Sequence, residues 1–291
     1  MDHYYLDFEP LSKMFYVADV VIRKFKNEGK VPILGLDPGD YPKLGCVTPK
    51  ESAPVVGILA GRSGDCYSVS RRHILALAKK GFIIRLLSYE YCNQQLNTCH
   101  GIVLAGENFF FPKHFFAESK QPSSPISDVR VWATLLYLRL ALKQQIPILG
   151  IGDGALVIAA EFGLKMYPDA KCIESPILHR ANKPVAHRID VFPNTPLSRL
   201  LGCQSQMFVN SWHTAILAPR RKQYEVFAEK FNIDISKAEL PFDIYAEAND
   251  GVPEAWGAEK LHILCVQWHP EEAPEMLDIY QGLAEDIAIL R

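Results

Sequence analysis

The sequence has no pair of cysteines spaced as CxxC, although it contains seven cysteines in 291 residues. Seven is an odd number, and the cysteines are scattered through apolar runs such as the one around Cys265. This usage is typical of reduced, buried thiols and unlike a disulfide framework. A cytoplasmic location is therefore expected.

The chain also has no apolar run close to the roughly 20 residues needed to cross a bilayer. Its start, MDHYYLDFEP, is acidic and shows no apolar segment behind a basic cluster. The formal net charge is only −2, so nothing calls for a nucleic-acid partner. We expect a soluble protein without a leader that binds neither membranes nor nucleic acids.

The first 52 residues differ in pattern from the rest. Apolar residues recur at helical spacing between residues 4 and 29, which predicts an amphipathic helix; they are Met14, Val17, Val20, Val21 and Phe25. Residues 31–54 are rich in Pro and Gly and predict a connector without regular structure. Because the helix would otherwise expose an apolar stripe, we expect segment 1–52 to pack against the main domain or a second subunit.

Residues 53–291 are predicted to form one α/β domain. Short apolar runs alternate with helical patterns, which favours a doubly wound, mostly parallel sheet with helices on both faces. The predicted strands lie in residues 54–59, 82–87, 101–106 and 146–151, and the predicted helices in 71–79 and 128–143. The C-terminal half adds segments that are mostly strands, and a helix follows Pro274.

The strongest local motif is a strand that runs directly into Gly152-Asp153-Gly154 and then into a helix. Hydrolases use such an elbow to hold a nucleophile in a strained conformation at the sheet edge. A plain tight turn, a dinucleotide-binding turn and a phosphate-binding loop are the alternatives. The third glycine of GxGxxG and a following Lys-Ser/Thr are both absent, which disfavours the two nucleotide-binding alternatives.

A second motif is VQWHPEE, in which a predicted strand ends at His269 and Glu271 follows two residues later. One strand end can supply both the base and the orienting acid of a catalytic triad in this way. The same pair can equally serve to close the strand end by hydrogen bonding.

Together these segments resemble the class I glutamine amidotransferase superfamily, and more closely its gamma-glutamyl-gamma-aminobutyrate hydrolase branch. Three further segments agree in the same order: HRIDVFPNTPLSRLLG, MFVNSWHTAI and AEANDGVPEAW. The resemblance runs from Val55 to Glu271 and implies a flavodoxin-like fold. It also implies hydrolysis of a C–N amide bond by a cysteine, with His269 as base and Glu271 as its orienting acid.

The sequence departs from the family pattern at the elbow. Gly152 stands at the position of the cysteine nucleophile and Asp153 at that of an arginine, so the resemblance implies a lost thiol and a Gly152 close to the His269 ring. Other expected pocket positions have changed too, with Leu156 in place of a glutamine. The oxyanion and pocket residues implied by the resemblance are Gly106, Glu107, Phe109, Asp153, Asn210, Ser211 and His213.

Three functions remain open. The first is a pseudoenzyme that binds a small gamma-glutamyl-like ligand, a protein partner or a second copy of itself. The second is a residual hydrolase that uses water or Asp153 with His269. The third is a structural or interaction module whose pocket is filled by Phe109 or Leu156.

No cofactor and no metal ion are expected. The acidic pair Asp250 and Glu254 flanks Gly251 and is interpreted as a hairpin feature, because no third ligand is apparent nearby. Asn210, Ser211 and His213 can likewise serve only to order a turn.

Overall fold

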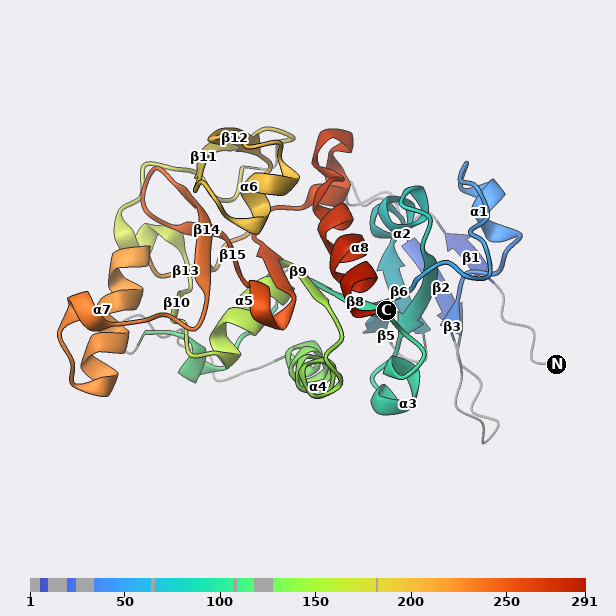
Figure 1. Ribbon diagram of the computed structural model, residues 1–291, viewed down its shortest axis with the longest axis horizontal. Coiled ribbons are helices and arrows are strands. Elements are labelled where there is room, and N and C mark those ends of the chain that lie inside the picture. Colours follow the sequence, from blue (N-terminus) through green and yellow to red (C-terminus); the bar gives the residue numbers. More distant parts are fainter. Residues whose placement is uncertain are drawn as a thin grey trace.

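The computed structural model describes residues 6–9, 20–24, 34–63, 66–106, 109–117, 128–181 and 183–291. Its main feature is a sheet of ten strands (Figure 1). The strand order is β12 (Gln206–Val209), β11 (His187–Val191), β14 (Asp243–Ala248), β15 (Pro253–Ala258), β16 (Ile263–Val266), β9 (Ile148–Gly152), β8 (Gly101–Gly106), β4 (Val55–Leu59), β7 (Ile83–Leu87) and β3 (Leu34–Gly35).

The middle of this sheet is parallel. Strands β16, β9, β8, β4 and β7 run in one direction, and the remaining strands pair antiparallel at both sides. The described residues also form a four-stranded antiparallel sheet and a two-stranded sheet. They comprise β1 (Leu6–Glu9), β2 (Val20–Lys24), β6 (Cys66–Ser70) and β5 (Gly61–Ser63), and β10 (Met166–Tyr167) and β13 (Ile216–Leu217).

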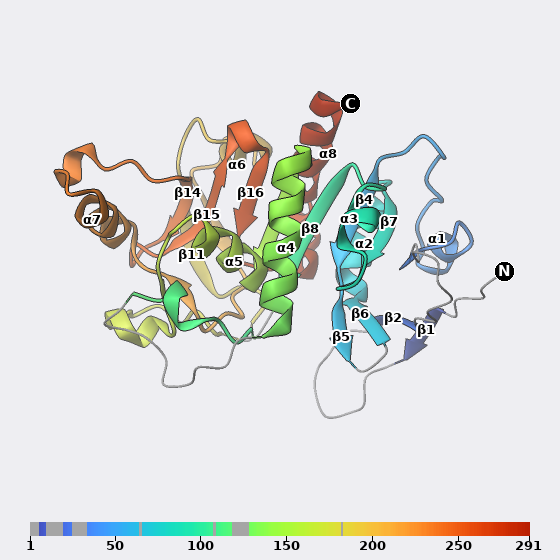
Figure 2. The ribbon, with the colours of Figure 1, turned by 90° about the horizontal axis from the view of Figure 1, so that it is seen from below.

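Helices cover both faces of the parallel strands. In Figure 1, α2 (Arg71–Lys79) and α8 (Ile279–Leu290) lie above these strands, whereas α3 (Cys92–Leu96) and α4 (Val129–Gln144) lie below. Figure 2 shows α4 and α5 (Asp153–Glu161) in front of the sheet. Alternating strand residues feed two cores, since Leu149 packs with α2 and α8 and Ile148 with α4 and α5. The predicted α/β fold is confirmed.

The helix predictions agree closely with the structure. The side chain of Ser70 caps α2 and that of Asp128 caps α4, each by accepting a hydrogen bond from the backbone N–H two residues later. The remaining helices are α1 (Asp40–Lys43), α6 (Pro196–Leu200) and α7 (Arg220–Phe231). Short 3-10 turns span Lys113–Phe115, Ala170–Ile173, Ile235–Lys237, Glu259–Leu261, Pro270–Glu272 and Pro274–Met276.

The predicted helix over residues 4–29 is wrong where the structure describes this segment. Strands β1 and β2 pair with each other, and β2 also pairs with β6. The β-branched run Val20-Val21-Ile22 accounts for the difference, because such residues favour strands over helices. Val17 and Phe25 lie outside the described residues.

The connector is also more regular than predicted. It contains β3, which pairs with β7 at the edge of the main sheet, and α1. The Tyr41 hydroxyl donates to the carbonyl of Phe82 and accepts from the N–H of Ile84. This part of the segment packs against the main domain, whereas the domain boundary near residue 53 stays a prediction.

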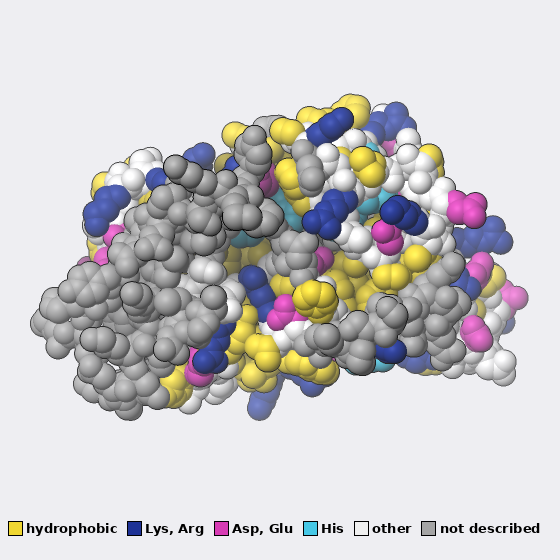
Figure 3. Space-filling view, turned by 180° about the vertical axis from the view of Figure 1, so that it is seen from behind, with side chains coloured by type: hydrophobic (Ala, Val, Ile, Leu, Met, Phe, Trp, Pro, Cys, Tyr) yellow, Lys and Arg dark blue, Asp and Glu magenta, His cyan; other side chains and the backbone are white. Residues whose placement is uncertain are grey.

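The surface charges and the burial of the thiols give little indication of the function. On the described part of the face in Figure 3, basic and acidic side chains are interspersed. Within the described residues, no helix combines the length and the hydrophobicity that a membrane span requires. Six described cysteines are free thiols; Cys265 is buried as expected, but Cys203 is exposed.

Candidate active site

The elbow is formed where β9 ends at Gly152 and α5 begins at Asp153. Gly152 has φ 58° and ψ −128°, a conformation that side-chain-bearing residues rarely adopt. A Cβ on Gly152 would lie 2.9 Å from Nε2 of His269 and 2.6 Å from the carbonyl oxygen of Gly106. The predicted strained backbone and the nearness of His269 are therefore confirmed.

Gly154 is needed for a different reason. A Cβ there would lie 2.0 Å from the carbonyl oxygen of Leu104. Glycine thus allows the first turn of α5 to approach β8 closely, which fixes the elbow against the sheet.

His269 is held in one orientation by two neighbours. Its Nδ1 lies 2.8 Å from Oε1 of Glu271, and because a carboxylate only accepts hydrogen bonds, Nδ1 carries the hydrogen. The Asn210 side chain holds the His269 backbone by two hydrogen bonds: it donates to the carbonyl at 2.8 Å and accepts from the N–H at 2.9 Å. Nε2 therefore faces Gly152, which is the orientation that a general base requires.

His73 joins this pair and was not predicted from the sequence. It reaches from α2, with Nε2 3.2 Å from Oε1 of Glu271 and Nδ1 3.1 Å from the hydroxyl of Tyr280. Burial alone would raise the pKa of Glu271, but the neighbouring His73 and His269 outweigh it and lower this pKa to about 2. No motif marks His73, so only its place on the buried face of α2 could have suggested it.

A phenylalanine occupies the other side of the elbow. The backbone N–H of Phe109 donates to Oδ2 of Asp153 at 2.7 Å. The ring packs directly on Gly106, since its Cζ lies 2.1 Å from where a Cβ of Gly106 would stand. Leu156 is fully buried on α5. Glu107, which was also predicted to line the pocket, lies outside the described residues.

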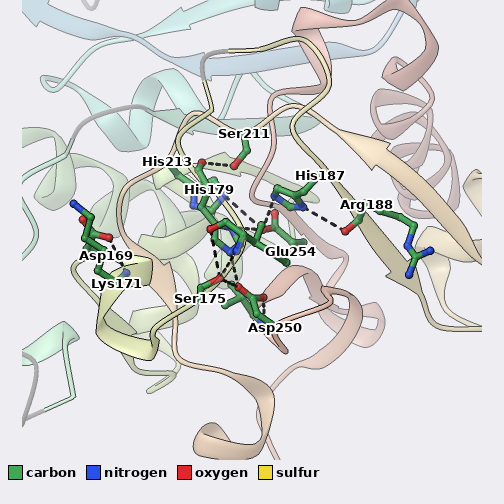
Figure 4. Close-up of polar contacts among 12 residues, drawn as sticks. Asp169, Lys171, Ser175, His179, His187, Arg188, Ser211, His213, Asp250 and Glu254 are labelled. Atoms are coloured by element: carbon green, nitrogen blue, oxygen red, sulfur yellow. Dashed lines mark hydrogen bonds and ion pairs between the residues drawn. The ribbon is translucent and has the colours of Figure 1, made fainter.

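The predicted pocket residues Asn210, Ser211 and His213 divide between two groups. Asn210 contacts His269, whereas Ser211 donates through Oγ to the carbonyl of His179. His213 belongs to a second buried group, shown in Figure 4. We call it the histidine cluster, and its members are His179, His187, His213 and Glu254.

Asp250 and Glu254 lie on opposite nitrogens of the His179 ring, 2.9 Å from Nε2 and 3.1 Å from Nδ1. Asp250 accepts from the N–H of Val252 at 3.2 Å, which agrees with a turn between β14 and β15. Glu254 points into the histidine cluster. The expectation that no third potential metal ligand lies near this pair is therefore wrong, because three histidines from distant parts of the sequence lie around Glu254.

The ionisable side chains in and beside the histidine cluster shift one another's pKa values. Burial would lower the pKa of His179, but the carboxylates of Asp250 and Glu254 outweigh it and raise this pKa to about 9. Burial lowers the pKa of His213. It also opposes ionisation of Glu254, yet the surrounding imidazoles hold the pKa of this carboxyl below its usual range.

A parallel α/β sheet with a strained elbow facing a buried His–Glu pair defines a protein of the glutamine amidotransferase type. Solved structures that share this fold include the following two. A Thermoplasma acidophilum protein designated a GMP synthase subunit has a TM-score of 0.56 and 15% identity over 83% of this chain and 98% of its own. The glutaminase domain of Trypanosoma brucei CTPS has a TM-score of 0.52 and 13% identity over 80% and 94%.

The sequence comparison is more specific. The family described as Peptidase C26 matches residues 69–271, well over half of the chain, so the chain belongs to this family. A Schizosaccharomyces pombe protein designated a glutamine amidotransferase is 28% identical over 78% of this chain and 84% of its own. A Rickettsia prowazekii protein designated glutamine amidotransferase-like is 25% identical over 75% and 91%.

Proposed function

We propose that this chain keeps the glutamine amidotransferase architecture for binding and has lost cysteine-dependent hydrolysis of gamma-glutamyl amides. The observation that carries the proposal is the geometry at Gly152. A side chain there would start 2.9 Å from Nε2 of His269, the position at which a triad places its nucleophile beside the base. Glycine supplies no thiolate, and losing the nucleophile of a triad typically lowers kcat on the order of a million-fold.

The neighbours of Gly152 support the same proposal. Asp153 places a carboxylate at the first turn of α5, where acyl transfer would need positive potential for a developing oxyanion. Phe109 packs over Gly106 and adds bulk where substrate would bind. The ligand of such a protein would be a small gamma-glutamyl-like molecule or a protein partner, including a second copy.

Residual hydrolysis by water is the second candidate, because the His269–Glu271 pair is intact and Nε2 faces Gly152. Asp153 is a poor choice of nucleophile. Its Oδ2 already accepts the backbone hydrogen bond of Phe109 at 2.7 Å, which a nucleophilic carboxylate would have to release.

A glutamate-release assay with glutamine and gamma-glutamyl amides tests the proposal. We expect no turnover from the native protein, and no rescue by Gly152→Cys, since Asp153 and Phe109 remain. The double variant Gly152→Cys with Asp153→Arg should do better, because it restores the thiol and removes the negative charge. A mild electrophile should label the new thiol in both variants.

Gly152→Ala is the matched control, because it adds the same Cβ near the Gly106 carbonyl without a thiol. Thermal unfolding of both single variants then separates backbone strain, expected at about 1–3 kcal/mol, from lost chemistry. Native turnover that disappears in His269→Ala would revive the hydrolase candidate. Native turnover that survives this change would refute a role for the His269–Glu271 pair.

A further inference from the structure

The inner atoms of the histidine cluster face one another without hydrogen bonds. Nδ1 of His179 and Nε2 of both His187 and His213 lie 3.1, 3.5 and 3.5 Å from Oε1 of Glu254. Among the residues that the structure describes, none of these atoms, and neither carboxylate oxygen of Glu254, has a hydrogen-bond partner. Buried polar atoms are nearly always hydrogen-bonded, so four such residues at one point require another explanation.

The outer nitrogens of the three rings show where the hydrogens lie. Each faces an oxygen that can only accept, so each outer nitrogen carries a hydrogen, and each ring in its neutral form presents its inner lone pair to the centre of the cluster. The pairs are His179 Nε2 with Asp250 Oδ2 at 2.9 Å, His213 Nδ1 with the Ala215 carbonyl at 3.2 Å, and His187 Nδ1 with the Arg188 carbonyl at 3.4 Å.

We propose that the histidine cluster is a closed binding site for one divalent transition-metal ion of the zinc type. Three imidazole nitrogens and one carboxylate oxygen form a complete tetrahedral ligand set for such an ion. Bonds of about 2.0–2.1 Å put tetrahedral ligand atoms about 3.4 Å apart. The separations of 3.1–3.5 Å from Glu254 fit this spacing, and all four ligand atoms lie within 4.8 Å of one another.

The surroundings of the histidine cluster match those of known metal sites. Ligating histidines usually donate their other N–H to a carboxylate or carbonyl, as all three do here. The Asp250 carboxylate is itself fixed by Ser175 and the N–H of Val252. A surface pocket of about 400 Å³ is lined by His179 and His213, which gives an ion a route from solvent.

The ion would cross-link segments that are remote in sequence. The ligands come from the loop after residues 170–173, the start of β11, the turn after β12, and β15. The turn after β12 also carries Asn210, which grips the backbone of His269. The ion would thus stabilise the segments around His269. Because all four coordination positions would be filled by protein ligands, the role of the ion would be structural.

The test is metal analysis of the full chain, freed of any affinity tag, after growth with added zinc. We expect one zinc per chain in the native protein. Glu254→Gln and His213→Ala should each lose it, and Asp250→Asn should weaken zinc affinity about 10- to 100-fold. His262→Ala is the matched control, because it removes one histidine from a partly exposed pair with Asp286; it should keep one zinc.

The native chain tests the proposal even where a variant does not fold. Removing the ion with a chelator should lower the Tm, and zinc should restore it at a one-to-one ratio. Cobalt in place of zinc should give the visible absorption of a tetrahedral site. A native chain that binds no zinc and gains no Tm from it would overturn the proposal and favour a protonated His179 between its two carboxylates. Zinc retained by both Glu254→Gln and His213→Ala would also overturn it.

Discussion

At the scale of single residues, Glu271 has a structural role beside its contact with His269. Its Oε1 lies within 2.8 Å of His269 and 3.2 Å of His73, and it is buried. His73 in turn contacts Tyr280 on α8. The carboxylate therefore links α2, α8 and the end of β16, and this structural role does not depend on a thiol at Gly152.

Replacing Glu271 by Gln should make part of the stability independent of pH. The native pKa of Glu271 is about 2, below its ordinary value of 4.5, so its ionised form stabilises the fold above pH 4.5. That contribution is lost as the pH falls through this range toward 2. At pH 7 the variant should be less stable by about 3 kcal/mol.

Urea unfolding between pH 3 and 7 measures this difference, with His73, His269 and Tyr280 unchanged in both proteins. The gap between native and variant should shrink as the pH is lowered. A gap that is the same at pH 3.5 and pH 7 would show that the charge of Glu271 contributes no stability.

At the scale of elements, the first turn of α5 positions the loop after β8. Asp153 stands where a helix favours negative charge, and its carboxylate also accepts the N–H of Phe109. One side chain thus favours the helix start and draws the Phe109 ring onto Gly106. In the double variant with a new thiol, Asp153→Arg would release this loop as well as change the charge.

Asp153→Ala should therefore lower the stability more than Asp153→Asn. The alanine leaves the Phe109 N–H without its acceptor, which costs about 1.5–3 kcal/mol for a bond to a charged group. The asparagine keeps an acceptor oxygen and should lose about half as much. Urea unfolding gives both values, and hydrogen exchange at the Phe109 amide should increase only in Asp153→Ala. Equal losses in the two variants would mean that this hydrogen bond does not hold the loop.

At the scale of the whole molecule, the features that the sequence predicts are those encoded by a periodic pattern or by neighbouring residues. Strand β9, helix α4 and the His269–Glu271 pair were predictable because each is encoded by neighbouring residues. His73 and the histidine cluster were not, because the sheet assembles them from segments far apart in the chain. The sequence predicts a helix where the N-terminal strands form, because widely spaced apolar residues fit both periods, whereas their β-branched side chains favour strands.

Deleting residues 1–52 should destabilise the remaining domain. The deletion removes the edge strand β3, which leaves β7 unpaired on one side. It also takes away Tyr41, which is 1% exposed and hydrogen-bonded to Phe82 and Ile84. Burying one such side chain contributes about 1.5–3 kcal/mol, so the full deletion should cost at least this much and leave an apolar surface that promotes aggregation.

Tyr41→Phe is the matched point variant, because it keeps the ring and loses about 1–2 kcal/mol with the two hydrogen bonds of the hydroxyl. Urea unfolding and light scattering compare the three proteins. If the fragment 53–291 unfolds at the same urea concentration as the full chain and stays monomeric, the first 52 residues are dispensable for the fold.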